Sequence, residues 1–445
     1  MLAEGAHCEI WVERNCGVDE DQAQEVADHF DEVIFPKMIN AFSLRDIKDG
    51  NDTYDNVIEF ASSIITPEGK TPSGKLCILL LDIKDGYNGI TNRSYVAGYF
   101  WMGNFFSRSQ VSSSNERSMI FVDTNPGMDP ENIEGTYKTL AHEMQHLMNF
   151  ATTVLSRSIE NSQGQITKLN YMDTWVDEGL AAAAEWVYSG EYSEDRIEWF
   201  KYSGSQNGSM KGLINKGNNF FVWNNRSKES QYAVLDDYAT VNIFFQWLRL
   251  QTNESIYRSI ITSKDNDYNA VTKAFNAAAS RSFTWDELLK TWLAANYINN
   301  STGLYGYKND SELKDIRIPA PASIAANIQL APGEGVYSRM TPTTATMPAQ
   351  SGSIRYASLS KQPLEVGNTA ANGRVLLTYN VNTLGTSLET GITTGSPILA
   401  NTVTAGRSAS PAFDGPYRIG ATNLQPINVE LLGGLNLRKG KNSDE

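Results

Sequence analysis

Two of the four histidines in this 445-residue chain, His142 and His146, stand four positions apart in the stretch "TLAHEMQHLMNF". Apolar residues recur through the stretch with helical spacing, and side chains four positions apart on a helix point to the same side. Two such imidazoles can bind one divalent ion, and Glu143 can reach a water bound to it. The alternative is a pair of surface histidines, but a chance HExxH pattern in so histidine-poor a chain has a probability on the order of a few per thousand. We therefore predict a zinc site, with one Zn²⁺ per chain.

The third protein ligand has to be a carboxylate, because no histidine follows His146. The best candidate is Glu178 in "DTWVDEGLAAAAEWVYSG", a segment that predicts a helix from Asp173 or Thr174 to Gly190. The alternative is a solvated acidic helix face. Three protein ligands leave a coordination position open for water, and Glu143 is then the expected general base for an attack on a peptide bond.

These two segments resemble the gluzincin arrangement, in which a Trp-x-x-Glu-Gly segment on a second helix supplies the third zinc ligand. The resemblance implies that His142, His146 and Glu178 bind zinc. It also implies that Glu185 matches the acidic residue that steadies a ligand histidine in the aminopeptidase-N-type branch. The chain departs from the better-known branches because thirty-one residues separate His146 from Glu178, and because Ala182 stands where thermolysin has an aspartate.

The order of four segments is similar to that in the hyicolysin family of secreted bacterial zinc metallopeptidases, over roughly residues 7 to 250. The segments are "YVAGYFWMGNFFS", "SNERSMIFVDTNPG", "TLAHEMQHLMNF" and "WVDEGLAAAAE". The resemblance implies an extracellular or cell-surface endopeptidase that acts on a protein or peptide substrate. Related gluzincins place a catalytic tyrosine near the helix "QYAVLDDYATVNIFFQWL", so Tyr238 and Tyr232 are candidates to stabilise the oxyanion. The alternative is that both tyrosines only pack.

The distribution of patterns along the chain, with this resemblance, predicts an α+β fold. Strand patterns occur at 7–13, 75–83, 94–101 and 118–124, and a helical pattern from 21 is interrupted by Pro36. We expect a zincin-like metallopeptidase domain with a mixed sheet, an active-site helix and a helical subdomain, followed by a C-terminal β-sandwich. The expected parts are 1–128 for the N-terminal α/β part, 129–315 for the helical zinc-site part, and 320–445 for the sandwich.

Three local patterns leave alternatives open. The stretch "SMIFVDT" is either a sheet edge that pairs with a substrate peptide or an interior strand. The aromatic cluster "YFWMGNFF" either walls a substrate pocket or fills the core. The stretch "DIKDGNDTYD", with Asp46, Asp49, Asp52 and Asp55, is a weak candidate for Ca²⁺ and otherwise a set of solvated turns, because it lacks two features of an EF-hand loop. A polar, glycine-rich stretch at 203–231 predicts a long loop.

Composition excludes several classes of partner. The 37 basic and 51 acidic residues give a net charge of −14, which opposes binding to nucleic acid or an anionic membrane. No apolar run approaches the roughly 18 residues of a membrane span, and the start "MLAEGAHCEI" has no signal-peptide pattern. Cys8, Cys16 and Cys77 form no disulfide framework, although they leave room for one bridge, such as Cys8 with Cys16.

Three other interpretations remain beside the endopeptidase. An aminopeptidase would use the same zinc site, but it would need a carboxylate-lined pocket for the substrate amine. An inactive relative that serves as a surface adhesin or binding protein would have no use for the base Glu143. A structural metal site would normally close the fourth ligand position. The oligomeric state, the cleavage preference and any prosegment are not predicted.

Overall fold

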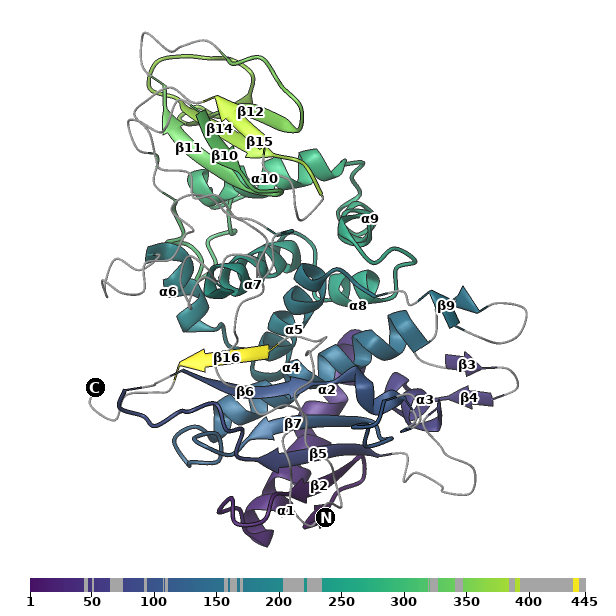
Figure 1. Ribbon diagram of the computed structural model, residues 1–445. Helices are drawn as coiled ribbons and strands as arrows, with labels where there is room; N and C mark the ends of the chain where they lie inside the picture. Colours follow the sequence, from purple (N-terminus) through teal and green to yellow (C-terminus); the bar gives the residue numbers. More distant parts are fainter. Residues whose placement is uncertain are drawn as a thin grey trace.

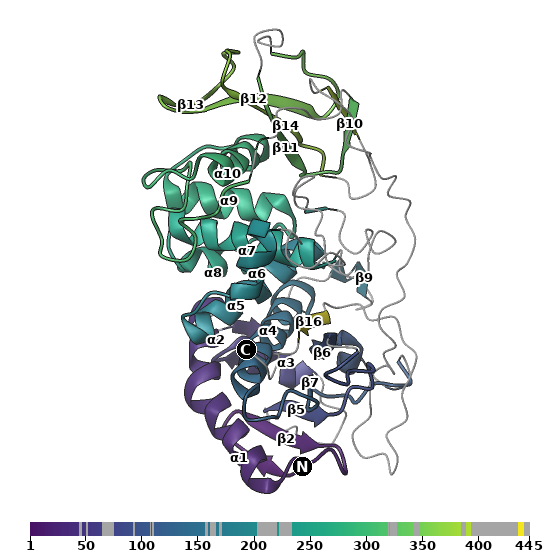
Figure 2. The same cartoon turned by 90° about the vertical axis from the view of Figure 1, so that its left-hand side faces the viewer.

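The computed structural model describes most of the chain. The described residues are 1–43, 47–49, 52–64, 75–91, 94–106, 108, 111–155, 159–160, 166–168, 171–202, 220–221, 234–318, 320, 327–340, 347–383, 389–392 and 435–439. Figure 1 shows a mixed sheet at one end, a layer of helices in the middle and a smaller antiparallel sheet at the other end. Figure 2 shows the same three layers from the side.

The larger sheet contains six strands in the order β1-β2-β5-β7-β6-β16. Their bounds are β1 (Ala3–Glu4), β2 (Cys8–Val12), β5 (Leu76–Leu81), β7 (Met119–Asp123), β6 (Ser94–Phe100) and β16 (Leu435–Lys439). Strands β2, β5 and β7 are parallel, and the other neighbours are antiparallel. The four strand patterns of the first third therefore form strands as predicted. The stretch "SMIFVDT" forms β7, an interior strand, so the alternative of a substrate-binding edge is wrong for that segment.

Strand β5 is apolar without interruption because both of its faces are buried. Leu76, Ile78 and Leu80 belong to the main hydrophobic core, whereas Cys77 and Leu79 belong to a second cluster on the opposite face. Side chains alternate between faces along a strand, and only a sheet covered on both sides accepts an unbroken apolar run. The aromatic cluster "YFWMGNFF" is buried in the same region, which supports its alternative role as core.

Helices cover the face of the larger sheet that belongs to the main core. They are α1 (Glu20–His29), α2 (Phe35–Phe42) and α4 (Ile133–Phe150), with a π-helical segment, Phe30–Ile34, between the first two. Helix α1 starts at a capping box between Asp19 and Gln22. Asp129 as a cap and Pro130 at the first helical position predict a helix start near residue 129. Helix α4 starts later, at Ile133, because Asp129 and Asn132 form a turn in which the Asn132 N–H donates to the Asp129 carbonyl at 2.8 Å.

The middle layer packs six helices around a cluster of buried aromatic side chains. The helices are α5 (Thr174–Ser189), α6 (Glu194–Tyr202), α7 (Val234–Gln251), α8 (Ser255–Ile261), α9 (Tyr268–Ala279) and α10 (Trp285–Ile298). Trp175, Phe244, Trp247 and Trp292 are the centre of the cluster. None of the helices in the described residues is long and apolar enough to cross a membrane.

Short elements lie around these layers. They are α3 (Val57–Ile64), a 3₁₀ turn (Met102–Phe105), a π-helical segment (Ala151–Leu155), and the hairpins β3 (Ile47–Asp49) with β4 (Asp52–Tyr54) and β8 (Ile159–Glu160) with β9 (Ile166–Lys168). Asp49 and Asp52 of the calcium candidate pair across the first hairpin, and Asp46 lies outside the described residues, so a calcium site stays a prediction. The predicted loop at 203–231 also lies almost entirely outside them. Cys8, Cys16 and Cys77 are free thiols.

A separate antiparallel sheet follows the helices. It has the order β11 (Gly335–Arg339), β14 (Val375–Asn380), β12 (Ile354–Lys361) and β13 (Leu364–Gly367), and the pair β10 (Asn327–Leu330) and β15 (Glu389–Ile392) lies beside it. Two tyrosines join it to α10, because Tyr337 donates to the Leu293 carbonyl and Tyr379 donates to Asp286 Oδ1, both at 2.6 Å. The predicted separate β structure is thus present, whereas a sandwich and a boundary at 320 stay predictions. Strand β16 belongs to the same predicted domain, yet it pairs with β6.

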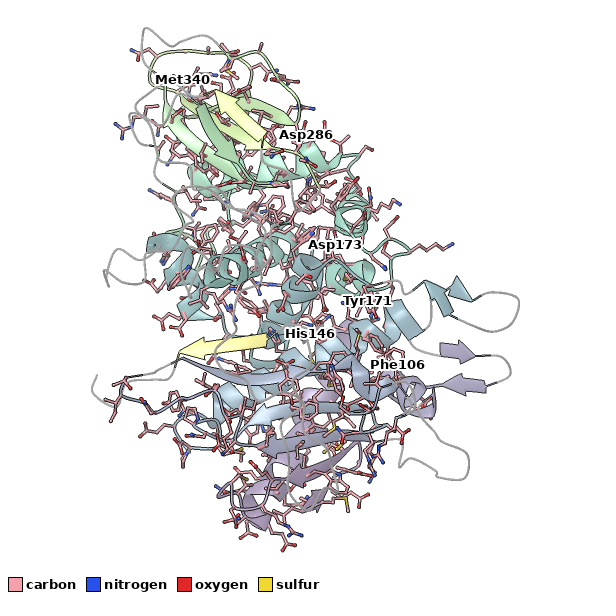
Figure 3. The ribbon with its side chains drawn as sticks, in the orientation of Figure 1. Phe106, His146, Tyr171, Asp173, Asp286 and Met340 are labelled. Atoms are coloured by element: carbon pink, nitrogen blue, oxygen red, sulfur yellow. The ribbon has the colours of Figure 1, made fainter. Side chains whose placement is uncertain are left out.

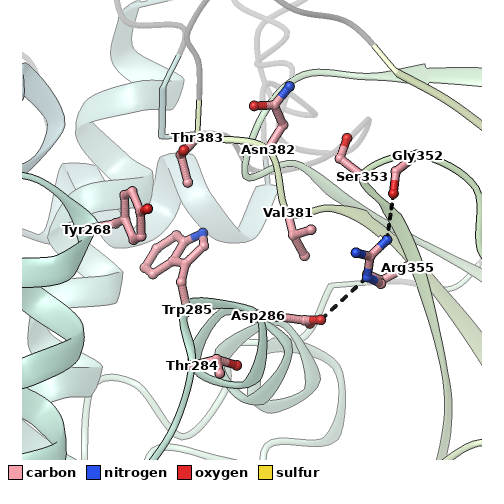
Figure 4. A pocket seen from close by; sticks show the side chains of 10 residues that line it. All are labelled: Tyr268, Thr284, Trp285, Asp286, Gly352, Ser353, Arg355, Val381, Asn382 and Thr383. Atoms are coloured by element: carbon pink, nitrogen blue, oxygen red, sulfur yellow. Dashed lines mark hydrogen bonds and ion pairs between the residues drawn. The ribbon is translucent and has the colours of Figure 1, made fainter.

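An open cleft of about 570 Å³ lies where α10 meets the C-terminal sheet. Figure 4 shows Trp285, Asp286 and Arg355 in its wall, with Arg355 Nε 3.6 Å from Asp286 Oδ2. Figure 3 shows Asp286 in a different layer from His146. This cleft is therefore separate from the histidine pair.

Candidate metal centre

Helices α4 and α5 pack closely against each other and bring the predicted ligands together. Small residues make the approach of α5 to its neighbours possible: a Cβ at Gly179 would lie 2.2 Å from the Phe245 ring of α7, and the four alanines at 181–184 are all buried. Helix α5 begins after Asp173 and ends at Gly190, whose φ of 73° suits glycine. Both ends lie where the sequence predicts them.

The side chains of His142, His146 and Glu178 converge. One ligand atom of each lies within 4.8 Å of the others. Glu178 Oε2 is 3.5 Å from His142 Nε2 and 3.7 Å from His146 Nε2. Ligand atoms held about 2.0–2.1 Å from a tetrahedral zinc lie roughly 3.3 Å apart. The donor set therefore has nearly the spacing that a zinc ion requires.

The polar atoms at the centre of this cluster have no hydrogen-bond partner in the described part of the chain. They are His142 Nε2, His146 Nε2, Glu178 Oε2 and both carboxylate oxygens of Glu143. The four residues are almost fully buried, with exposures from 0 to 2 %. Buried polar atoms are normally hydrogen-bonded, and each exception calls for an explanation such as an ion. A bound divalent cation would satisfy the orphaned ligand atoms together.

Carboxylates face the outer nitrogens of both histidines. His142 Nδ1 lies 2.9 Å from Glu185 Oε1 in a hydrogen bond, as the resemblance implies. His146 Nδ1 lies 3.0 Å from Asp177 Oδ2, close enough for a hydrogen bond, but the angle between the groups does not fit one. Asn149 Nδ2 donates to the other oxygen of Asp177 at 2.5 Å. Such partners fix the tautomer and orientation of a metal-binding imidazole.

The amino-acid sequence alone does not single out Asp177. Asp177 is an acidic residue directly before the proposed ligand Glu178, and this position is the only sequence signal for it. Successive side chains on a helix point about 100° apart, so the spacing does not show that Asp177 contacts a ligand histidine.

The charge balance of the centre favours a cation. Burial lowers the pKa of His146, but the carboxylates of Asp177, Glu178 and Glu143 outweigh it and raise this pKa to about 10. The pKa of His142 is also raised: burial lowers it, whereas Glu178 and Glu185 raise it by more. A metal ion can bind only the neutral imidazoles, so it replaces protons that the carboxylates otherwise hold there.

The side chain of Glu143, which belongs to α4, faces strand β6. A Cβ at Gly98 of β6 would lie 2.7 Å from Thr139 Cγ2 and 3.3 Å from Glu143 Cγ, so glycine allows the helix to approach the strand. Burial raises the pKa of Glu143 to about 7; His142 and His146 lower it, and Glu178 raises it. A carboxylate with a pKa near 7 can both accept and return a proton at neutral pH.

Tyr238 of α7 points at the same cluster. Its hydroxyl donates to Glu178 Oε1 at 3.4 Å, and the side chain is 2 % exposed. Burial raises its pKa well above 10, and Glu178 raises it further, so the hydroxyl keeps its proton and can act as a donor. The other candidate, Tyr232, lies outside the described residues.

Comparison with known proteins gives one informative similarity. No protein-family model matches the chain. The chain is 27% identical over 318 residues to the neutral metalloprotease ShpI of Staphylococcus hyicus, which covers 70% of this chain and 61% of that protein. The chain thus spans about three fifths of the length of the relative that it matches. Together with the buried cluster of two histidines and a glutamate, this similarity supports a distant relationship to metalloproteases and a metal-binding site.

Proposed function

We propose that the chain is a zinc-dependent endopeptidase of the hyicolysin type, with His142, His146 and Glu178 as zinc ligands and Glu143 as general base. The observation that carries the proposal is the convergence of these three ligand atoms, which lie within 4.8 Å of one another beside a Glu143 carboxylate without a hydrogen-bond partner in the described residues. A structural site would not need such a carboxylate.

The protein groups divide the work of hydrolysis. A zinc ion, when bound, lowers the pKa of water and polarises the carbonyl of the peptide bond. Glu143 accepts the proton of the attacking water and returns it to the leaving amine. Glu185 orients His142, and Asp177 orients His146. Tyr238 donates its hydroxyl proton in a hydrogen bond to the developing oxyanion.

The test compares Glu143→Gln with the unchanged protein. Glutamine has nearly the same shape but cannot take the proton, so we expect hydrolysis of unfolded casein to fall by at least about a hundredfold. Metal analysis should find one zinc per chain in both proteins, and a chelator should abolish activity until zinc is restored. Full activity of the zinc-loaded variant would overturn the role of Glu143.

Peptides with a blocked amino terminus separate endopeptidase from aminopeptidase activity. An endopeptidase cleaves an N-acetylated peptide internally, whereas an aminopeptidase needs the free amine. We expect internal cleavage of the acetylated peptide. Zinc binding without any cleavage would instead favour the inactive binding protein. The extracellular location belongs to the same proposal and rests on the family resemblance.

A further inference from the structure

A buried arginine lies against the tyrosine of the proposed site. Arg196 belongs to α6, and its guanidinium carbon lies 4.4 Å from the centre of the Tyr238 ring. Arg196 is only 8% exposed. Within the described part of the chain, its guanidinium makes this contact but has no ion pair or hydrogen bond.

The guanidinium keeps access to the solvent. None of its nitrogens is among the buried side-chain atoms that lack a partner in the described residues, so the 8% of the side chain that remains exposed includes this group. The cation–π contact with Tyr238 uses none of the five N–H donors of the guanidinium. These donors are therefore available to a ligand that reaches the site from the solvent.

Two carboxylates near Tyr238 accept hydrogen bonds from aromatic side chains. Asp236 of α7 accepts a hydrogen bond from the Trp199 indole at 2.6 Å. Glu178 accepts from the Tyr238 hydroxyl at 3.4 Å and points its other oxygen at the histidines. The Tyr238 ring thus has the guanidinium on its face and the metal-ligand cluster at its hydroxyl end. A group that binds Arg196 therefore lies close to the group that reacts.

We infer that Arg196 is a specificity determinant that binds a carboxylate of the peptide substrate beside the cleaved bond. The inference rests on the proposed peptidase function and adds the substrate class. A guanidinium matches a carboxylate because two parallel N–H donors meet its two oxygens. The carboxylate comes either from an Asp or Glu side chain near the cleaved bond or from the free C-terminus of a short peptide.

Equilibrium binding tests the arginine without requiring turnover. The zinc-loaded Glu143→Gln protein is titrated with two pairs of fluorescent peptides. The first pair has either Glu or Gln at a position next to the bond that the active protein cleaves in casein. The second pair has either a free carboxylate or an amide at the C-terminus. A hydrogen bond to a charged group contributes about 1.5–3 kcal/mol, so we expect one carboxylate peptide to bind roughly tenfold or more tightly than its amide partner. Which pair shows the preference identifies the source. If the active protein cleaves no casein, the Glu or Gln residue is instead placed at each position of one fixed peptide in turn.

Adding Arg196→Gln should reduce the ratio of the affinities for the carboxylate and amide peptides to about one. Arg196→Lys keeps the charge but loses the two parallel N–H donors, so it should give an intermediate ratio. The exposed Arg281 provides the matched control, because Arg281→Gln removes the same charge from another surface and should leave the ratio unchanged. A merely structural role would weaken binding of carboxylate and amide peptides alike.

Two outcomes overturn the inference: no carboxylate preference in the parent protein, or a preference that survives Arg196→Gln. Neither depends on hydrolysis. A failure of the proposed function would appear instead as an unchanged protein that holds zinc but cleaves nothing, so the two failures are distinguishable.

Discussion

At the scale of single residues, the carboxylates behind the histidines should control metal affinity. Asp177 Oδ2 lies 3.0 Å from His146 Nδ1 and is held by Asn149. Asp177→Asn removes the negative charge that stabilises and orients the imidazole, so we expect zinc affinity to fall about 10- to 100-fold. Competition with a chelating dye measures it. Asp21→Asn, an exposed change on α1, is the control and should have no effect. An unchanged affinity in Asp177→Asn would show that Asp177 does not support the ligand.

The residue scale also shows what a sequence can reveal about a site. His142 and His146 are found from spacing alone, because four positions on a helix fix their relative direction. Glu178 follows because a carboxylate has to complete the set. Asp177 and Arg196 are not found, because their roles arise from the packing of α5 against α4 and of α6 against α7. No local pattern determines such contacts between helices.

At the scale of elements, alanine substitutions at two helical glycines should change the free energy of unfolding in opposite directions. A Cβ at Gly179 in α5 would lie 2.2 Å from Cε2 of the Phe245 ring, whereas a Cβ at Gly135 in α4 would meet nothing within 4 Å. We expect Gly179→Ala to lower the free energy of unfolding by about 1–3 kcal/mol through overpacking. Gly135→Ala should raise it by about 0.5–1 kcal/mol through helix propensity. Denaturant unfolding of both variants measures the difference, and equal effects would contradict the packing of α5 on α7.

The end of strand β7 should make stability depend on pH. Asp123 is fully buried and accepts hydrogen bonds from the N–H groups of Ile83 and Asn125, at 2.9 and 3.2 Å. Burial raises its pKa to about 8, although these two N–H groups lower it. The folded state therefore holds a proton that the unfolded chain loses near its ordinary pKa of about 3.9, and stability from this group declines as the pH rises from about 4 to about 8.

Asp123→Asn should remove that decline, because an amide carries no charge to bury. We expect the variant's unfolding temperature, relative to that of the unchanged protein, to increase steadily between pH 5 and pH 8. Both proteins are measured in chelator, so that the metal ligands titrate equally. Asp129→Asn, in an exposed turn, is the control. A constant difference across this range would show that Asp123 is ionised throughout.

The elements themselves are the part of the fold that the sequence predicts best. Strand β5 and helix α5 have clear signals: an unbroken apolar run for the first, and an αL glycine at the end of the second. The start of α4 is predicted too early, because Asp129 and Pro130 are typical of a helix start but here belong to a preceding turn. Local preferences do not show which of two adjacent turns continues into the helix.

At the scale of the whole molecule, pairing between distant segments is what the sequence hides. The sequence predicts a C-terminal β domain at 320–445, and a four-stranded antiparallel sheet is present in that part of the chain. Strand β16, however, pairs with β6, more than 330 positions earlier in the chain. Registers of this kind depend on which edge is available in the folded protein, and no periodicity within either segment encodes it.

The C-terminal sheet also shares its hydrophobic core with the helices. Tyr337, Leu377 and Tyr379 belong to the main core, whereas the alternate residues Val336 and Leu376 belong to a small cluster on the other face. One face of the sheet therefore rests on α10, and the sheet and the helical layer should unfold together in one cooperative transition.

A chain shortened to residues 1–318 tests this coupling when it is compared with a chain shortened to residues 1–434, because both lack β16 and its pairing with β6 but only the shorter chain lacks the C-terminal sheet. Removing the sheet exposes the surface of α10 that contacts β12 and β14, so we expect a lower unfolding temperature and increased binding of a dye that reports exposed apolar surface. Zinc binding should persist, because all three proposed ligands lie on α4 and α5. An unchanged unfolding temperature without dye binding would mean that the sheet folds as an independent domain. Loss of zinc in the 1–318 chain but not in the 1–434 control would mean that the C-terminal sheet supports the metal centre across the helical layer.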